Sequence, residues 1–269
     1  LGHADLISAD QINELKDDYP DVKIGQWFLD PLNKKGPDFE RNKDRILDKI
    51  NSVDASFLTT SPSVLNFLKN DNNFFIPNPS DKSFETLNNF KKSCSVDVFF
   101  ALSHGVHRGV LKSGKVDDRI NFIKKLVEST PNVKFDIYGV NKVQPIWADH
   151  YFKTISNAKM GLNLSRGDAI KYYSSDRITQ IIGNGLVCLI DEKTKYRDFF
   201  NDNEMIFYNN LNDLSEKILK ISNDEKMRKN VAKKGKDKYM KYFNSTLVAE
   251  FIIDKILHRN NKKKYLWHN

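Results

Sequence analysis

The fold is decided by residues 159–191, which read KMGLNLSRGDAIKYYSSDRITQIIGNGLVCLID. The first six of these residues are mostly apolar, a polar loop follows, and residues 174–182 have the composition of a helix. Gly183 and Gly185 predict the end of that helix, because glycine adopts the left-handed conformation of a helix C-cap. Residues 186–190 are a second apolar run. Strand, helix and strand in this order predict a βαβ unit of a parallel sheet.

The same alternation continues in both directions from this unit. Further strands are predicted at 22–28, 55–60, 74–76, 96–102 and 133–138. Helices are predicted between them at 8–18 (with Ser8 as N-cap), 42–50, 63–69, 117–127 and 150–157, and two more helices follow the last strand. The alternation predicts an α/β fold with mainly parallel sheets.

Pro77 and Pro79 interrupt the pattern, because proline continues neither a helix nor a central strand. We therefore expect a hinge there, followed by a polar connecting helix as far as Lys92. The predicted domains are 1–80, 81–245 and a C-terminal helix with a basic tail, 246–269, that packs back on the first domain. Only about three strands precede the hinge, so the N-terminal domain is expected to be short or truncated.

Composition excludes several classes of protein. The chain has 269 residues, and its mean hydropathy is −0.57, with no apolar run of the ~18 residues that a membrane helix needs. Its two cysteines, Cys94 and Cys188, have neither the number nor the spacing of a disulfide scaffold or a zinc site. The net charge of +8 favours anionic partners, but lysine is abundant throughout, so we do not expect nucleic acid as a partner.

Polar loops follow several strands of the second half. Ligands of open parallel sheets bind at the carboxyl ends of the strands, and phosphates bind where loop amides and helix N-termini meet. We therefore expect a phosphate-bearing ligand at residues 103–119 and 165–177. Arg177 lies in the first turn of a predicted helix, where a cation opposes the helix dipole, so it needs either a neighbouring carboxylate or a ligand phosphate. Ser174 or Ser175 is expected to cap that helix.

One segment of the first loop admits another reading. Gly109-Val110-Leu111-Lys112-Ser113-Gly114-Lys115-Val116 follows the GxxxxGK[ST] pattern, except that Val116 replaces the residue that would hold Mg²⁺. A P-loop NTPase is therefore an alternative. The segment is otherwise a basic loop, with His104, Arg108 and Arg119 near an anionic ligand or in solvent.

Three other side chains are candidates for a site. Trp147 lies in a loop, where it either stacks on a nucleobase or packs in the ordinary way. His3 and Asp30 lie near predicted strand ends, where either can remove a proton from an acceptor hydroxyl. For Asp30, which precedes Pro31, a turn role is the alternative.

The order of several motifs resembles the GT-B glycosyltransferases, in particular their family-1-type, CgeB-like branch. The motifs are Lys159–Leu164, Ser175–Gln180, Ile182–Asp191, Tyr196–Phe200, Glu204–Tyr208, Leu211–Leu214 and the junction Ile76–Asp81. The resemblance covers residues 76–256 well and the first 75 loosely. It implies two Rossmann-like domains, of which the second binds a nucleotide-sugar and the first an acceptor, without metal or cofactor.

The resemblance also assigns roles to residues. The donor diphosphate would contact His104, Gly105, Arg108, Arg119, Arg166 and Arg177. The nucleoside would contact Val143, Trp147, Tyr172 and Gln180, and Asp30 or His3 would be the catalytic base. Retaining relatives carry two glutamates eight residues apart, at the positions of Tyr172 and Gln180, so this chain lacks the usual carboxylate partner of the ribose.

The sequence therefore predicts a glycosyltransferase that moves a sugar from a nucleotide-sugar to a hydroxyl of a glycan or lipid-linked acceptor. A cytoplasmic protein is expected, with the basic tail, residues 258–267, either in contact with an anionic membrane or free in solvent. The alternatives are a module that binds a nucleotide or a partner without turnover and, less favoured, the P-loop NTPase.

Overall fold

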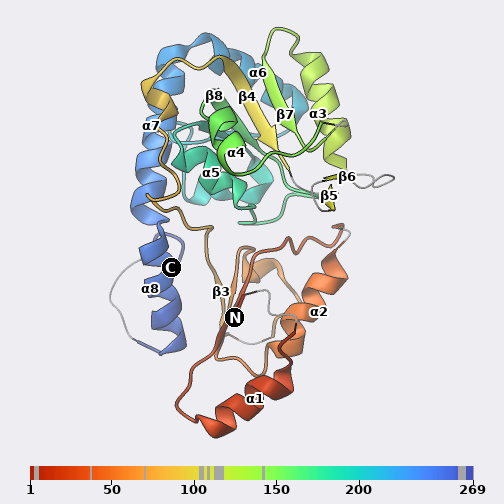
Figure 1. The fold of residues 1–269 in the computed structure, drawn as a ribbon, viewed down its shortest axis with the longest axis vertical. Helices are drawn as coiled ribbons and strands as arrows, with labels where there is room; N and C mark the ends of the chain where they lie inside the picture. Colours follow the sequence, from red (N-terminus) through yellow and green to blue (C-terminus); the bar gives the residue numbers. More distant parts are fainter. Residues whose placement is uncertain are drawn as a thin grey trace.

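The computed structural model describes residues 1–2, 6–36, 38–69, 71–102, 106–107, 110–111, 118–140, 143–259 and 265–268. Its main strands form two sheets, one in each half of the chain (Figure 1). The first has the order β1-β2-β3 and the second the order β10-β9-β8-β4-β7, and every neighbouring pair in both is parallel. The predicted α/β class with parallel sheets is confirmed.

The N-terminal sheet consists of β1 (Gly25–Phe28), β2 (Ala55–Leu58) and β3 (Asn73–Phe75). The central strand β2 is buried along its whole length, as its run of small and apolar residues requires. Helices α1 (Ala9–Asp18) and α2 (Phe39–Lys49) belong to the same half, together with the 3₁₀ turn η1 (Pro62–Val64). Ser8 caps α1 as predicted, and Gln11 returns the hydrogen bond in a capping box.

The C-terminal sheet is larger and buried on both faces. Its strands are β4 (Val96–Ala101), β7 (Phe135–Tyr138), β8 (Ala158–Asn163), β9 (Val187–Asp191) and β10 (Ile206–Tyr208), and the short hairpin β5 (Val106–His107) and β6 (Val110–Leu111) follows β4. Its helices are α3 (Asp118–Ser129), α4 (Ala148–Ile155), α5 (Arg177–Gly183), α6 (Leu211–Asn223) and α7 (Glu225–Tyr242). Phe99 and Cys188 pack with α5 in one hydrophobic cluster, whereas Val98 and Phe100 pack with α3 and α6 in another.

The close approach of α5 to β8 depends on a glycine. A Cβ atom at Gly161 would lie 2.5 Å from Cγ1 of Ile181 on α5, well inside van der Waals contact. This packing fixes the first turn of α5, and with it Arg177, against the carboxyl end of β8.

The C-terminal helix α8 (Ser245–Ile256) lies beside the N-terminal sheet rather than the second one (Figure 1). The chain crosses between the halves where Asn244 pairs with Ser80 in an isolated β-bridge. The Phe251 ring then packs edge-on against Phe57 of β2 and Phe74 of β3, with centroids 6.3 and 6.0 Å apart. Helix α8 thus completes the core of the N-terminal half.

Three local predictions are wrong. The segment as far as Lys92 is not a helix; it forms turns and the 3₁₀ turn η2 (Asn89–Lys91). The carboxylate of Asp81 accepts hydrogen bonds from the backbone and the hydroxyl of Ser83, and such local bonds compete with helix formation. The predicted helix at 63–69 is only the turn η1. Three helices instead of two follow the last strand; the last of them, α8, coincides with the C-terminal helix predicted in 246–269, and the Asn244 side chain caps it by accepting from the Leu247 N–H.

Candidate active site

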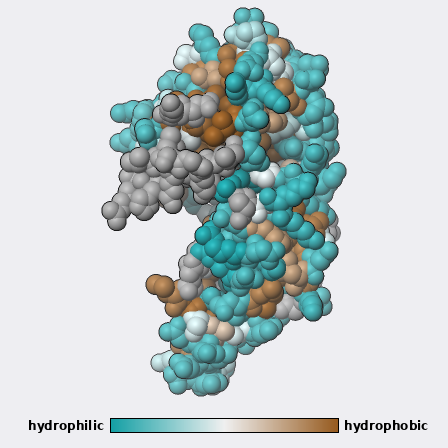
Figure 2. All heavy atoms as spheres, turned by 90° about the vertical axis from the view of Figure 1, so that its right-hand side faces the viewer, coloured by the Kyte–Doolittle hydropathy of each residue, from teal (hydrophilic) through white to brown (hydrophobic). Residues whose placement is uncertain are grey.

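A cavity of about 460 Å³, here called the central cavity, lies between residues of the two halves. Figure 2 shows hydrophilic residues on the surface where the two halves meet. Four of the predicted site residues line the cavity: Asp30 after β1, Arg119 on α3, Arg166 after β8 and Arg177 on α5. Segments that follow parallel strands therefore build it, as is usual in open sheets.

Arg177 is buried, with 9% of its surface exposed. Its Nε donates to the carbonyl of Ala101 at 3.0 Å, and its Nη1 donates to the carbonyl of Leu164 at 3.2 Å and to Oγ of Ser175 at 3.0 Å. The guanidinium also lies 5.1 Å from the ring centre of Phe100. Arg177 thereby ties α5 to the carboxyl ends of β4 and β8.

The acceptors found for this guanidinium in the described part of the chain are neutral oxygen atoms. Burial lowers the pKa of Arg177, and the nearby positive charge of Arg119 lowers it further. Arg119 is itself buried, with 6% exposure, and lines the same cavity. Four arginines and three aspartates line this cavity, so the charge of its lining is positive on balance and favours an anion. This arrangement favours the phosphate rather than the carboxylate as the counter-charge of Arg177.

The expected serine cap of α5 is wrong. The residue before the helix is Asp176, whose side chain makes no capping hydrogen bond. Ser174 instead accepts from the Asn163 amide and donates to the carbonyl of Ser175, and Ser175 accepts from Arg177. Both serines thus hold the loop before α5 in place.

Arg166 has a different environment from the other two arginines. Its Nη1 lies 3.0 Å from Oδ2 of Asp38, at the start of α2 in the N-terminal half. The Asn33 amide of the same half donates to the Arg166 carbonyl at 3.1 Å. Gly167, with φ of +71°, brings the loop so close to Asn33 that a Cβ atom would lie 2.6 Å from its Oδ1. Arg166 therefore joins the two halves, and Asp38 already balances its charge.

A second cavity of about 460 Å³, here called the Trp147 cavity, adjoins the first. Trp147 and Gln180, both predicted to contact the nucleoside, line it. The two cavities share Leu102, Asp176 and Arg177, so they meet at the arginine.

Trp147 is 49% exposed, so a flat side chain is available at the edge of this cavity. The next residue, Ala148, has φ of +49°, a conformation that costs a non-glycine residue energy and turns the chain sharply into α4. The Tyr151 hydroxyl, also on the cavity wall, is buried without a hydrogen-bond partner in the described structure, and burial raises its pKa. An aromatic edge with polar groups behind it suits a base and a ribose.

Two predicted nucleoside contacts line neither cavity. Val143 is 43% exposed on the loop before Trp147. The Tyr172 ring packs between Phe75 and Phe199, at centroid distances of 4.9 and 4.7 Å, and its hydroxyl donates to Asp198 at 2.8 Å. The structure thus gives Tyr172 a packing role at the junction of the halves, a correction to the predicted contact.

Asp30 lies on the N-terminal side of the central cavity, with 41% of its side chain exposed and Arg45 3.6 Å away. It lines the same cavity as the arginines of the other half. The other predictions, His3, His104, Gly105 and Arg108, lie outside the described residues, as do most of the P-loop-like segment and residues 260–264 of the tail.

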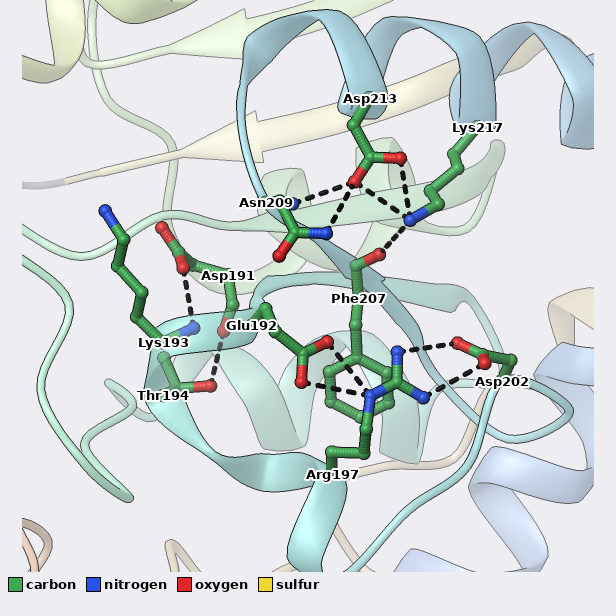
Figure 3. Close-up of polar contacts among 10 residues, drawn as sticks. All are labelled: Asp191, Glu192, Lys193, Thr194, Arg197, Asp202, Phe207, Asn209, Asp213 and Lys217. Carbon is green, nitrogen blue, oxygen red and sulfur yellow. Dashed lines mark hydrogen bonds and ion pairs between the residues drawn. The ribbon is translucent and has the colours of Figure 1, made fainter.

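A polar cluster follows β9 and β10 beyond these cavities (Figure 3). Arg197, on the 3₁₀ turn η4 (Tyr196–Asp198), bonds Glu192 through Nε and Asp202 through both terminal nitrogens, and lies 4.3 Å from the ring centre of Phe207. Both carboxylates are therefore engaged with Arg197. The cluster stabilises the loop that carries Asp198, the partner of Tyr172.

Sequence reasoning missed Asp176, which lies in the Ser175–Gln180 motif, and Tyr151, which lies in none of the motifs; both line the Trp147 cavity. The one available signal was the position of Asp176 directly before the first turn of α5. Within the described residues, no three His, Cys, Asp or Glu side chains are placed to hold a metal ion. No described helix is both long and apolar enough to cross a bilayer.

Residues 119–254, slightly more than half of the chain, match the family model described as glycosyl transferase-like. No curated protein matches the sequence. Several solved structures resemble the fold. Among them is S. aureus TarM, solved as a mutant in complex with fondaparinux, α-GlcNAc-glycerol and UDP. TarM is 16% identical to this chain, and the match has a TM-score of 0.61 and covers 86% of this chain and 50% of TarM. The present chain thus spans about half the length of TarM.

Two further structures are matched over more of their length. An α-glucosyltransferase with UDP and a 13-mer DNA is 13% identical, with a TM-score of 0.62 over 93% of this chain and 76% of that one. Anabaena HepE with UDP is 10% identical, with a TM-score of 0.63 over 93% and 77%. These neighbours are GT-B glycosyltransferases, so the likeness confirms the predicted fold, whereas the CgeB-like branch stays a prediction. The chain has the GT-B fold and belongs to the glycosyl transferase-like family.

Proposed function

We propose that this protein transfers a sugar from a nucleotide-sugar to a hydroxyl group of an acceptor. The observation that carries the proposal is the meeting of two cavities at Arg177, one with an exposed tryptophan and the other with two buried arginines. A nucleoside diphosphate has the matching parts in the same order: a flat base, a ribose and two charged phosphates. UDP is the first nucleotide to test, since it is bound in the structures of TarM, the α-glucosyltransferase and HepE.

In this proposal the base lies against Trp147, and the ribose lies near Gln180. A glutamine accepts and donates hydrogen bonds but carries no charge, so it binds ribose hydroxyls less strongly than a carboxylate does. The diphosphate lies at the junction of the cavities, beside Arg177 and Arg119. The sugar then points into the central cavity, toward Asp30 and the N-terminal half.

The chemistry follows from these positions. When the bond between sugar and phosphate breaks, negative charge grows on the leaving phosphate oxygen, and a preorganised guanidinium stabilises it. Asp30 removes the proton of the attacking hydroxyl. Because two arginines can supply the positive charge, we expect transfer without a metal ion. A glycan or lipid-linked acceptor, a cytoplasmic location and contact of the basic residues of the tail with an anionic membrane belong to this proposal as well. Tyr265 and Trp267 of the tail take no part in that contact, because both are buried against Phe251.

Thermal unfolding with a panel of nucleotides tests the proposal. UDP-glucose, GDP-mannose, dTDP-glucose and ATP are each added with excess EDTA and, separately, with Mg²⁺. A ligand at 100 times its Kd adds about 2.7 kcal/mol to the free energy of unfolding, which is a visible shift. We expect UDP-glucose to stabilise the protein equally with and without Mg²⁺. A shift with Mg²⁺-ATP alone would contradict the proposal and favour the P-loop alternative.

Turnover separates an enzyme from a binding module of the same fold. The release of UDP from UDP-glucose, first to water and then to added acceptors, is followed in the wild-type protein. Binding without any release, whichever acceptor is added, would favour the module. A substitution outside both cavities serves as the control. Lys233→Ala removes an exposed ion pair with Asp237 on α7, and we expect it to change neither the binding nor the release of UDP.

A further inference from the structure

A third cavity, here called the apolar pocket, is formed mainly by the N-terminal half. It has a volume of about 420 Å³, within the range of small-molecule sites. Its apolar lining residues are Leu32, Phe39, Val64, Leu65, Phe67 and Ile170. Neither the proposed donor site nor the proposed base uses any of these side chains.

The walls of the apolar pocket are fixed by the core behind them. Leu32 and Leu65 are 1% and 5% exposed and belong to the hydrophobic cluster of the N-terminal half. The rings of Phe39 and Phe67 meet edge to face, with centroids 6.2 Å apart. Val64, by contrast, is 37% exposed and forms part of the rim. A preformed pocket of this kind gains affinity from burying an apolar group without first having to order itself.

Two segments of the chain line both the apolar pocket and the central cavity, each with different residues. The segment between β1 and α2 contributes Asp30 and Asp38 to the central cavity and Leu32 and Phe39 to the apolar pocket. The loop after β8 does the same from the other half, with Arg166 on one side and Ile170 on the other. A molecule that fills the apolar pocket therefore lies next to the cavity in which the proposed transfer takes place.

Charge at the rim restricts the occupant further. Lys34 and Lys43 both line the pocket. The ammonium of Lys43 pairs with Glu40, whereas Lys34 is exposed and has no ion pair within the described part of the chain. An apolar group inside and a negative charge outside would satisfy both features of the pocket. A neutral glycan satisfies neither.

We infer that the acceptor is amphiphilic, with an alkyl or aromatic group in the apolar pocket, an anionic group such as phosphate near Lys34, and its hydroxyl in the central cavity. The inference deepens the proposed function. It rests on that function only where it identifies the bound molecule as the sugar acceptor. The pocket itself does not depend on that function, so binding and turnover are tested separately.

Binding is measured by calorimetry with methyl, butyl and octyl phosphate. Each buried methylene contributes about 0.8 kcal/mol, about fourfold in affinity, so affinity should rise steeply with chain length until the pocket is filled. We expect Val64→Asp to reduce the affinity for octyl phosphate at least ~30-fold and Lys34→Ala to weaken all three ligands by one common factor. The matched control is Val127→Asp on α3, where the valine is equally exposed at 36% but lines none of these cavities.

Turnover is measured as UDP release from UDP-glucose with octyl or methyl β-D-glucoside as acceptor. We expect only the octyl compound to accelerate release, and Val64→Asp to abolish the acceleration while leaving UDP affinity unchanged. An affinity that does not depend on chain length would overturn the inference that the apolar pocket binds the alkyl group. An equal loss of affinity in Val64→Asp and Val127→Asp would overturn it as well. Octyl phosphate binding without UDP binding would leave the pocket standing but refute the proposed function and the role as acceptor site.

Discussion

Replacing Arg177 by methionine removes the guanidinium at the junction of the two cavities but keeps an unbranched apolar stem. If this group stabilises the leaving diphosphate, its loss should lower kcat about 10²- to 10³-fold, the usual effect of removing one preorganised donor to a developing negative charge. The affinity for UDP should fall as well, because a charge-assisted hydrogen bond to the phosphate is lost.

The same substitution also has a structural effect that must be separated from the catalytic one. It leaves the carbonyls of Ala101 and Leu164 without their donor. An unsatisfied buried carbonyl costs about 1–3 kcal/mol, so with two of them the free energy of unfolding should fall by about 2–6 kcal/mol. Urea unfolding measures this loss, and turnover is then compared at a temperature at which both proteins remain folded.

Arg197→Met is the matched control for this experiment. Arg197 is likewise bonded to several acceptors and lies over an aromatic ring (Figure 3). Its side chain, however, is 40% exposed, and it lines neither cavity. We expect a loss of about 1–2 kcal/mol in stability and unchanged kcat. A decrease in kcat of less than tenfold in Arg177→Met, with unchanged affinity for UDP, would refute the catalytic role of Arg177.

Three further predictions concern the N-terminal half and the hinge. Asp30→Asn should lower kcat about 10²- to 10⁴-fold with unchanged UDP affinity, because the base is lost while the arginines at the diphosphate are kept; unaltered turnover would exclude Asp30 as the base. Asp38→Ala should lower the unfolding free energy by about 1 kcal/mol, measured in urea, because Arg166 loses its partner, whereas Asp168→Ala, which removes a fully exposed pair, should not. The hydroxyl of Ser245 and the N–H and hydroxyl of Ser83 hold the pKa of Asp81 at about 2, below its ordinary 3.8. The stability that this pKa shift contributes is present above about pH 4 and is lost as the pH falls through about 2. Ser245→Ala should therefore reduce the loss of stability between these two pH values, as measured by acid unfolding. Unfolding curves identical to those of the wild-type protein would contradict this.

Local sequence patterns predicted most elements of the fold. Mostly apolar runs of five to seven residues, such as 96–102 and 186–190, became buried parallel strands, because both faces of the sheet are covered. Ser8 revealed the start of α1, because a capping box is a contact between residues three apart. The segment after Asp81 was misjudged, because its side-chain hydrogen bonds replace those of a helix.

The site was harder to predict than the fold, because it depends on contacts between residues that lie far apart in the sequence. Arg166 was placed at the diphosphate because basic loop residues bind phosphates, yet its partner Asp38 is 128 residues away in the sequence. Tyr172 was placed at the nucleoside because of its position in a motif, yet its ring fills a gap between Phe75 and Phe199, which come from different halves. Arg177 was the most informative residue, because a cation in the first turn of a helix already implies a nearby negative charge.

The most direct test of the central claim is the position of UDP in a crystal of the protein grown with the nucleotide. The account predicts the uracil ring in the Trp147 cavity and a phosphate oxygen within about 3 Å of the Arg177 guanidinium, the distance of a charge-assisted hydrogen bond. UDP bound elsewhere, or bound in the Trp147 cavity with its phosphates directed away from Arg177, would contradict it.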